Sequence, residues 1–147
     1  MIKTLEELDE MWKEDCKIDE ANLVKEGARI PMLHHKYYME YVSVGLRVRK
    51  LKSDLKVLYK DKLDWITGAM AEEDLKDRGW KPNPRKILRS DVDKYLDADP
   101  DIIKLSLRID YQESIHKFLE DIVKQIAWRN NILGNMIQWS KFTAGVG

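Results

Sequence analysis

The sequence predicts an all-α protein in which long helices pair as an extended helical hairpin or bundle. Only 7 Gly and 4 Pro occur among its 147 residues, too few for the frequent turns of a β-sandwich or barrel. Apolar residues make up 44% of the chain and charged residues 35%, and the apolar ones recur every three to four residues, as on a helix face. The length suits a single domain covering residues 1–147.

The first two predicted helices cover residues 4–15 and 20–67. Thr4 and Glu7 match a capping box, which starts the first helix. Pro31 lacks a backbone N–H and disfavours helical geometry at the preceding residue, so we expect a short helix to about residue 28 and a kink or restart at Pro31. From Leu33 to Ile66 an apolar stripe then follows one helix face over about ten turns. A helix of that length needs a partner.

Helical periodicity fails between residues 68 and 89, which we expect to form a connection with one helical turn around residues 71–78. Asp91 starts a short helix over residues 91–96, and Asp99-Pro100 starts a long helix over residues 100–130. The remaining C-terminal segment, residues 128–145, is dense in large apolar side chains, namely Trp128, Ile132, Leu133, Met136, Ile137, Trp139 and Phe142.

This C-terminal segment predicts self-association. A chain end is usually frayed and polar unless something docks it, and so much apolar surface is rarely left in water. The segment either folds back onto its own long helix or packs against a neighbouring subunit. We favour the neighbouring subunit, because two long helices already compete for the same core.

Motifs and composition argue against an enzyme, a metal protein and a membrane protein. The chain contains no phosphate-binding loop, nucleophile elbow or zinc-protease motif, so we expect neither catalysis nor a cofactor. The single Cys16 and the three histidines offer no metal-ligand spacing. No stretch approaches 18 consecutive apolar residues, and the N-terminus does not resemble a signal peptide. We therefore expect a soluble protein of a reducing compartment.

Basic residues concentrate in one window of an otherwise neutral chain. The chain has 26 basic and 26 acidic residues, whereas residues 47–62 contain seven basic and two acidic residues, a net charge of +5. Helical angles place four of these cations within about 80° of one another, opposite the apolar stripe; they are Arg49, Lys52, Lys56 and Lys60. Such a ladder suits nucleic-acid phosphates, although solvent-facing lysines are as common on helices that bind nothing.

Lys62 and its aromatic neighbours are harder to interpret. The helical angle of Lys62 falls in the middle of the apolar stripe, where a lysine either snorkels from a helix end or serves a ligand. Tyr59 and Trp65 bracket the pair formed by Lys60 and Lys62. Aromatic side chains stack on the bases of single strands, but each of these is more often a core residue than a stacking platform.

The segment Lys60-Asp61-Lys62-Leu63-Asp64-Trp65 resembles the Lys-x-Arg-Leu-Asp-aromatic motif of the UvsY family, the recombination mediators of T-even-type phages. The resemblance spans nearly the whole chain and is poorest from residue 69 to 89, where this chain is longer. Two differences concern the motif itself. Lys62 replaces an arginine and so lacks the planar fork that grips phosphate, and Asp61 weakens the local positive field. Other short segments agree in order, namely Lys13-Glu14-Asp15, Met32-Leu33 with Lys36-Tyr37, and Phe142-Thr143-Ala144-Gly145.

The resemblance implies a function, partners and an assembly. By position, Lys60 and Lys62 would bind single-stranded DNA, and we expect Lys56, Lys52, Arg49 and Trp65 to add further contacts. Members of the family form ring-like homo-oligomers of six or seven subunits. Such a protein loads a RecA-like recombinase onto DNA covered by single-stranded-DNA-binding protein, without hydrolysing nucleotide. The resemblance also implies the cytoplasm of a bacterial host as its location.

Two other classes of function stay open on the sequence. One is a non-catalytic helical adaptor that packs against another protein and whose lysines only face solvent. The other is a regulator of double-stranded DNA, which is less favoured because no helix-turn-helix with a short glycine-containing turn is found.

Overall fold

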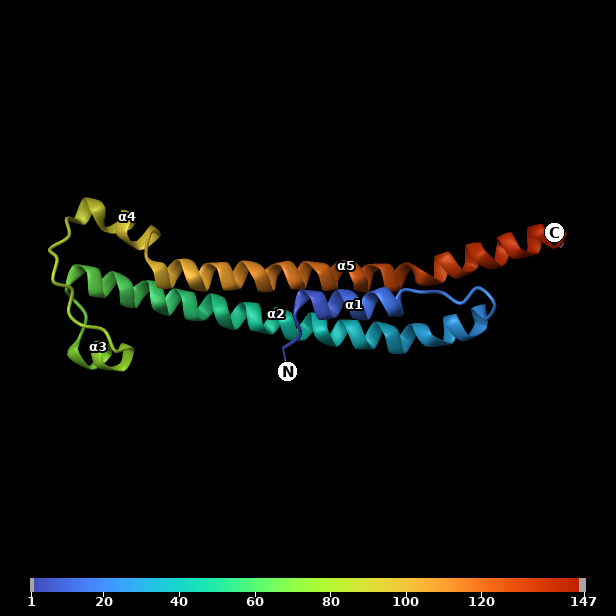
Figure 1. The fold of residues 1–147 in the computed structure, drawn as a ribbon, viewed down its shortest axis with the longest axis horizontal. Coiled ribbons are helices and arrows are strands. Elements are labelled where there is room, and N and C mark those ends of the chain that lie inside the picture. The colour runs from blue at the N-terminus through green and yellow to red at the C-terminus, as the bar shows by residue number, and fades with distance from the viewer. Residues whose placement is uncertain (1, 146–147) are drawn as a thin grey trace. The chain divides into compact units, whose positions relative to one another are not determined.

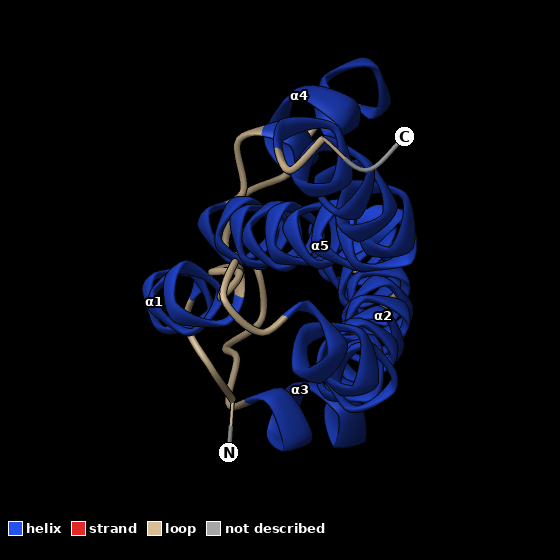
Figure 2. Cartoon of the chain, turned by 90° about the vertical axis from the view of Figure 1, so that its right-hand side faces the viewer, coloured by secondary structure: helices blue, strands red, loops and turns tan. Residues whose placement is uncertain are grey.

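The computed structural model describes residues 2–145, and within them the chain forms helices joined by loops, without a strand (Figures 1 and 2). The predicted all-α class is therefore confirmed. The α-helices are α1 (Leu5–Asp15), α2 (Leu23–Thr67), α3 (Glu72–Arg78), α4 (Val92–Asp97) and α5 (Pro100–Thr143), and a short 3-10 helix, η1 (Arg89–Asp91), precedes α4. Within residues 2–145, no helical segment combines the length and the apolar character that a membrane span requires.

The chain divides into two units. Unit 1 comprises residues 1–45 and 113–147, and unit 2 comprises residues 46–112. The long helices α2 and α5 each contribute one portion to both units. Unit 1 therefore holds α1 and the C-terminal segment, whereas unit 2 holds the basic window, the connection and α4.

Helix α1 begins at the predicted capping box. The backbone N–H of Glu7 donates to the Thr4 hydroxyl at 3.2 Å, and the Thr4 N–H donates to the Glu7 carboxylate at 2.9 Å. The helix lies beside α2 in unit 1, with the Trp12 ring set edge-on to the Tyr37 ring at 5.3 Å (Figure 1). Tyr37 is fully buried, and its hydroxyl donates to Asp15 at 2.7 Å.

Helix α2 passes through Pro31 without ending near residue 28, so of the two expected alternatives, a kink or a restart, the restart is wrong. Proline removes one intrahelical hydrogen bond, but buried residues lie on both sides of it, Glu26 before and Leu33 after. Pro31 itself is exposed, and because it has no N–H, the Gly27 carbonyl one turn earlier lacks its usual intrahelical donor. Packing on both sides thus outweighs the local helix-breaking signal.

Helix α5 continues to Thr143, although the sequence predicted its end near residue 130. Asn130, Asn131 and Gly134 have weak helix propensity, which is why the sequence favoured a break there. In the structure Arg129 and Leu133 are both buried in unit 1, and their burial holds the helix through the weak stretch. The C-terminal segment therefore forms the last part of α5.

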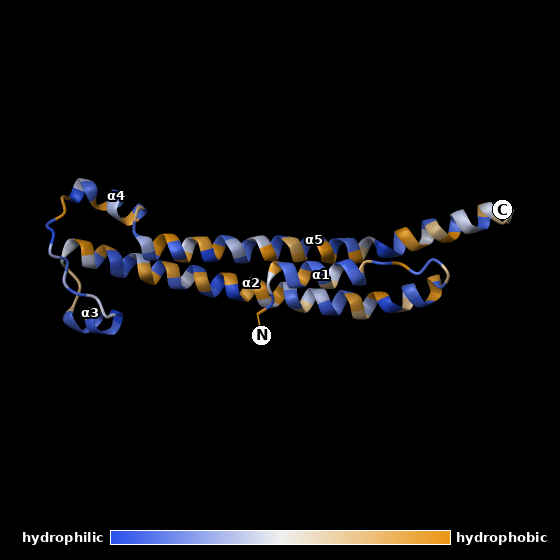
Figure 3. Ribbon diagram, in the orientation of Figure 1, coloured by the Kyte–Doolittle hydropathy of each residue, from blue (hydrophilic) through white to orange (hydrophobic). Residues whose placement is uncertain are grey.

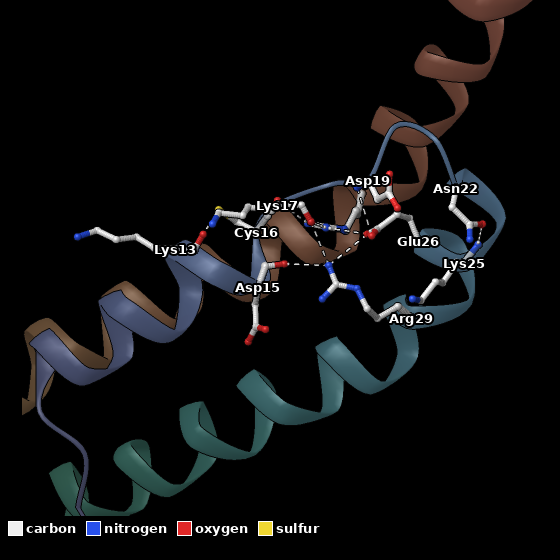
Figure 4. Close-up of polar contacts among 10 residues, drawn as sticks. Lys13, Asp15, Cys16, Lys17, Asp19, Asn22, Lys25, Glu26 and Arg29 are labelled. Carbon is white, nitrogen blue, oxygen red and sulfur yellow. Dashed lines mark hydrogen bonds and ion pairs between the residues drawn. The ribbon is translucent and has the colours of Figure 1, made fainter.

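A buried polar cluster ties the loop after α1 to α2 and α5 within unit 1 (Figure 4). The guanidinium of Arg129 donates to the carbonyls of Cys16 and Lys17 at 3.3 and 3.0 Å and to the Glu26 carboxylate at 3.3 Å. Arg29 donates to the same carboxylate at 3.2 Å. Burial raises the pKa of Glu26, but the Asp19 amide and the two guanidiniums outweigh that effect and lower it below its ordinary value.

Candidate nucleic-acid interface

The second half of α2 exposes a row of cations in unit 2. Its apolar side chains Val48, Leu51 and Leu58 are buried, and helical periodicity then turns the interleaved basic residues to solvent. All four residues of the predicted ladder are exposed, namely Arg49, Lys52, Lys56 and Lys60. We call these four residues the α2 ladder.

Members of the α2 ladder differ in how far their charge is already compensated. Lys60 pairs with Asp64 one turn later, with 2.9 Å between Nζ and Oδ2, and that hydrogen bond raises the pKa of Lys60 above its ordinary value. Arg49 and Lys56 form no ion pair within residues 2–145. An exposed pair such as Lys60–Asp64 is weak because water and salt screen it, so a phosphate can displace the aspartate.

Lys62 has a different environment from the α2 ladder. Only 8% of its surface is exposed, and its Nζ lies 2.7 Å from Asp101 Oδ2 and 3.1 Å from Asp99 Oδ2. The same ammonium lies 4.3 Å from the centre of the Trp80 ring, within range of a cation–π interaction. Two carboxylates and an aromatic face thus occupy the ammonium, which faces its own unit rather than solvent.

Asp99 has two roles at the start of α5. Its Oδ1 atom accepts hydrogen bonds from the backbone N–H groups of Asp101 and Ile102 at 2.9 and 3.1 Å, as a helix N-cap does. Its Oδ2 atom pairs with Lys62. One carboxylate therefore connects the motif on α2 to the first turn of α5, both within unit 2.

Trp65 is a packing residue in this structure. It is half-buried against the apolar cluster of Ile66, Val92 and Leu96. Its indole N–H donates to the carbonyl of Lys81 at 2.6 Å, and its ring meets Trp80 edge-on at 6.4 Å. These contacts hold the Trp65 ring of α2 against the connection, and its expected contact with DNA stays a prediction.

Arg78 and Trp80 were not predicted from the sequence. The Arg78 guanidinium donates to Asp61 Oδ2 through two nitrogens, at 2.9 and 2.8 Å. Asp61 therefore has its own cation, and it weakens the field around Lys60 less than the sequence suggested. No local signal marks these contacts, because Arg78 and Trp80 belong to the connection and meet α2 only through the tertiary fold.

The glycines of the connection make these contacts possible. Gly68 follows the end of α2 and Gly79 follows α3, with φ angles of 76° and 69°, a left-handed conformation that favours glycine. After Gly79 the chain returns, and the Trp80 N–H bonds the Leu75 carbonyl at 2.9 Å, as in a Schellman C-cap. This turn directs Trp80 onto Lys62.

Within unit 1, the C-terminal segment separates into one buried and several exposed apolar residues. Leu133 is 5% exposed and packs in its own unit, whereas Trp139 and Phe142 are 66% and 74% exposed and stack at 5.6 Å. Apolar residues continue along the last turns of α5 (Figure 3). The other predicted self-association residues are exposed or half-buried, namely Trp128, Ile132, Met136 and Ile137.

A hollow of about 380 Å³ lies beside this exposed patch. Its lining includes Leu23 of α2 and the α5 residues Ile132, Met136 and Trp139. Over residues 2–145, no group of three or more His, Cys, Asp or Glu side chains is placed to hold a metal ion.

Comparison with known proteins identifies relatives over nearly the whole chain. Residues 11–146 match the family described as "Recombination, repair and ssDNA binding protein UvsY". A protein of Enterobacteria phage T4 described as "Recombination protein uvsY" is 27% identical over 141 residues, which cover 96% of this chain and 98% of that protein.

Solved structures of the bacteriophage T4 recombination mediator protein UvsY have the same fold. In one crystal lattice the TM-score is 0.82 at 24% identity, over 97% of this chain and 99% of that one. In another crystal lattice the TM-score is 0.81 at 22% identity, over 95% of this chain and 99% of the solved one. Because the family match covers the α2 ladder, the connection and the C-terminal segment alike, the chain belongs to the UvsY family of recombination, repair and single-stranded-DNA-binding proteins.

Proposed function

We propose that this protein is a recombination mediator that binds single-stranded DNA and loads a RecA-like recombinase onto strands covered by single-stranded-DNA-binding protein. The observation that carries the proposal is the family match over residues 11–146. The exposed α2 ladder supports it independently, because cations on successive turns suit a sequence-tolerant phosphate contact. The protein acts without hydrolysing nucleotide, in the cytoplasm of a bacterial host.

In this proposal the residues of the motif have different tasks. Lys60, Lys56, Lys52 and Arg49 contact phosphates, because they are exposed along one side of α2. Lys62 and Trp65 act indirectly, since both are engaged within unit 2. They hold α2, the connection and the start of α5 together, so that the α2 ladder is presented on a fixed support.

The proposed mediator works as a homo-oligomer, a ring of six or seven subunits in keeping with the family resemblance. The exposed Trp128, Trp139 and Phe142 support an interface at the end of α5, because clustered large apolar residues on a surface mark interaction sites. Several subunits on one strand multiply the phosphate contacts, and multivalent binding exceeds the affinity of a single site.

A recombinase-assembly assay tests the mediator role. Single-stranded DNA is first covered with its single-stranded-DNA-binding protein, and a RecA-like recombinase with ATP is then added with or without this protein. We expect the recombinase ATPase activity to start without its usual lag only when the protein is present. The same lag at every concentration of the protein would contradict mediation, and this protein alone should hydrolyse no ATP.

The alternative function is a helical adaptor that packs against another protein and binds no DNA. The exposed cations of the α2 ladder do not favour it, but the exposed apolar end of α5 is compatible with it. The two proposals differ in their affinity for oligonucleotides, because an adaptor would bind none at any salt concentration.

A further inference from the structure

The segment from Arg78 to Ser90 in unit 2 carries positive charge only. It contains five cations and no acidic residue, and Arg78 alone is paired, with Asp61. The other four are exposed and form no ion pair within the described part of the chain. We call these four residues the basic loop; they are Lys81, Arg85, Lys86 and Arg89.

The basic loop is attached directly to the α2 motif. The Trp65 indole donates to the Lys81 carbonyl at 2.6 Å, and Trp80, the residue before Lys81, covers the Lys62 ammonium at 4.3 Å. Arg78 bonds Asp61, the sequence neighbour of Lys60. These contacts fix the start of the basic loop against the last turns of α2, where the α2 ladder ends.

Local geometry also limits the motion of the basic loop. Pro82 and Pro84 each fix one φ angle, and the Asn83 side-chain oxygen accepts a hydrogen bond from the Arg85 N–H at 3.1 Å, which forms an Asx turn. A loop ordered in advance loses less conformational entropy when it binds a ligand. Its cations are thus presented by a restrained segment rather than by a flexible tail.

The loop and the end of α2 enclose a hollow of about 290 Å³. Thr67 and Gly68 form part of one wall, and Arg85 and Lys86 form part of the other. Asn83 also lines this hollow, and its side-chain nitrogen is a buried donor without a partner among the described residues. Two cations and an unused donor around one hollow suit a ligand that supplies anionic oxygen acceptors.

We propose that Lys81, Arg85, Lys86 and Arg89 form a second phosphate-binding element, which extends the α2 ladder so that one DNA strand contacts both. The ligand class is the phosphodiester backbone of single-stranded DNA, and the inference rests on the proposed function. Phosphate contacts from this loop add affinity without reading sequence, because they reach no base edge. Arg85 and Arg89 supply planar guanidiniums suited to bidentate phosphate binding, the property that Lys62 lacks.

A charge-matched pair of variants tests the element. In the loop variant Lys81, Arg85, Lys86 and Arg89 are changed to Gln, and in the control variant the exposed Lys25, Lys94, Lys104 and Arg108 are changed to Gln. Both variants lose four positive charges, so a purely global charge effect is the same in each. Circular dichroism confirms the helical content of both before binding is measured with a labelled oligo-dT strand.

We expect the loop variant to bind at least about tenfold more weakly than the control variant at low salt. We also expect its plot of log K against log salt to be shallower, by about 0.7 for each phosphate that a bound protomer no longer neutralises. Equal affinity and equal salt slopes in the two variants would overturn the inference. If the unmodified protein binds no oligo-dT at all, the proposed function fails first, and the two failures are thereby distinguished.

Lysine footprinting gives a second readout on the unmodified protein. Acetylation of Lys81 and Lys86 by a small reagent is followed by mass spectrometry with and without oligo-dT, with Lys94 and Lys104 as internal references. Protection of Lys81 and Lys86 at least about threefold greater than that of the references supports the element. Protection no greater than that of the references contradicts it.

Discussion

Lys62 and Asp99 form a buried ion pair, with 3.1 Å between Nζ and Oδ2 and only 10% and 11% of the two side chains exposed. The pair joins the motif on α2 to the residue that caps α5. Within the family resemblance Lys62 stands at a position expected to bind DNA, yet its ammonium is directed to two aspartates of its own unit. This pair accounts for the division of tasks that we propose between Lys60 and Lys62.

The first prediction concerns the stability of unit 2. Changing Lys62→Met leaves the Asp99 carboxylate buried without its cation, so we expect the free energy of unfolding to fall by roughly 3 kcal/mol. Urea titration followed by circular dichroism measures the change. The matched control is Lys50→Met, which removes an exposed pair with Asp54 on the same helix and should cost less than about 0.5 kcal/mol. If both changes lower the free energy of unfolding by the same small amount, the ion pair of Lys62 does not stabilise the fold.

The second prediction distinguishes residues of α2 that contact DNA from a residue that stabilises the fold. Changing Lys56 and Lys60 to Gln should weaken binding of oligo-dT and leave the urea midpoint unchanged, because both side chains are exposed. Lys62→Met should have the opposite profile at a temperature where it stays folded, with reduced stability and most of the DNA affinity kept. Fluorescence anisotropy and urea titration on both variants provide the comparison. A folded Lys62→Met protein that no longer binds DNA would assign Lys62 a direct phosphate contact.

The third prediction concerns self-association. Changing the exposed Trp128, Trp139 and Phe142 to Gln should reduce the mass measured by sedimentation velocity without loss of helical content, because none of the three is buried in its own unit. Leu133→Ala serves as the contrast. Leu133 is buried, and its truncation should instead lower the free energy of unfolding by roughly 3 kcal/mol. An undiminished oligomer in the triple variant would place the interface elsewhere.

The fourth prediction concerns acid stability of unit 1. The pKa of Glu26 is lowered in the folded protein, so the folded state binds fewer protons than the unfolded state as the pH falls through the range in which carboxylates titrate. The stabilisation is fully present above the ordinary pKa of a glutamate carboxyl and is lost as the pH falls through the lower pKa of the folded state. Urea midpoints measured from pH 7 to pH 3 should therefore decrease at the acid end.

Glu26→Gln provides the control for this pH dependence. The amide keeps the size of the side chain but cannot titrate, so the variant should be less stable than the unmodified protein at neutral pH and should lose less on acidification. Asp15 contributes a similar but separate effect, because Lys36 and Tyr37 overcome the influence of burial and lower its pKa. If Glu26→Gln changes stability equally at all pH values, the cluster around Arg129 does not depend on the charge of Glu26.

Local patterns in the sequence were sufficient to predict the all-α fold class and to predict which side of a helix is exposed. The Thr4 capping box depends on residues three apart, and the exposure of Arg49 and Lys56 follows from the helical period alone. Two element boundaries failed for one shared reason. At Pro31 and at Asn130, local propensity favoured an end of the helix, while buried neighbours such as Leu33 and Leu133 favoured its continuation.

The candidate site was less accessible to sequence reasoning. The angle of Lys62 placed it correctly in the apolar stripe, but the helical period alone pointed only to a snorkelling or a ligand-binding lysine. The actual partners Asp99 and Asp101 belong to the start of α5, and only the path of the connection brings them to Lys62. Arg78 and Trp80 were missed because their contacts depend on the turns at Gly68 and Gly79, which no helical or strand period encodes.

The salt dependence of single-strand binding shows whether the α2 ladder holds the DNA backbone. Binding of labelled oligo-dT is measured by fluorescence anisotropy over a range of salt concentrations, for the unmodified protein and for the variant with Lys56 and Lys60 changed to Gln. We predict that log K falls steeply with log salt for the unmodified protein and that the variant has a slope shallower by about 0.7 for each phosphate that it no longer neutralises. Absence of binding, or a slope identical in the two proteins, would contradict the claim that the α2 ladder holds the DNA backbone.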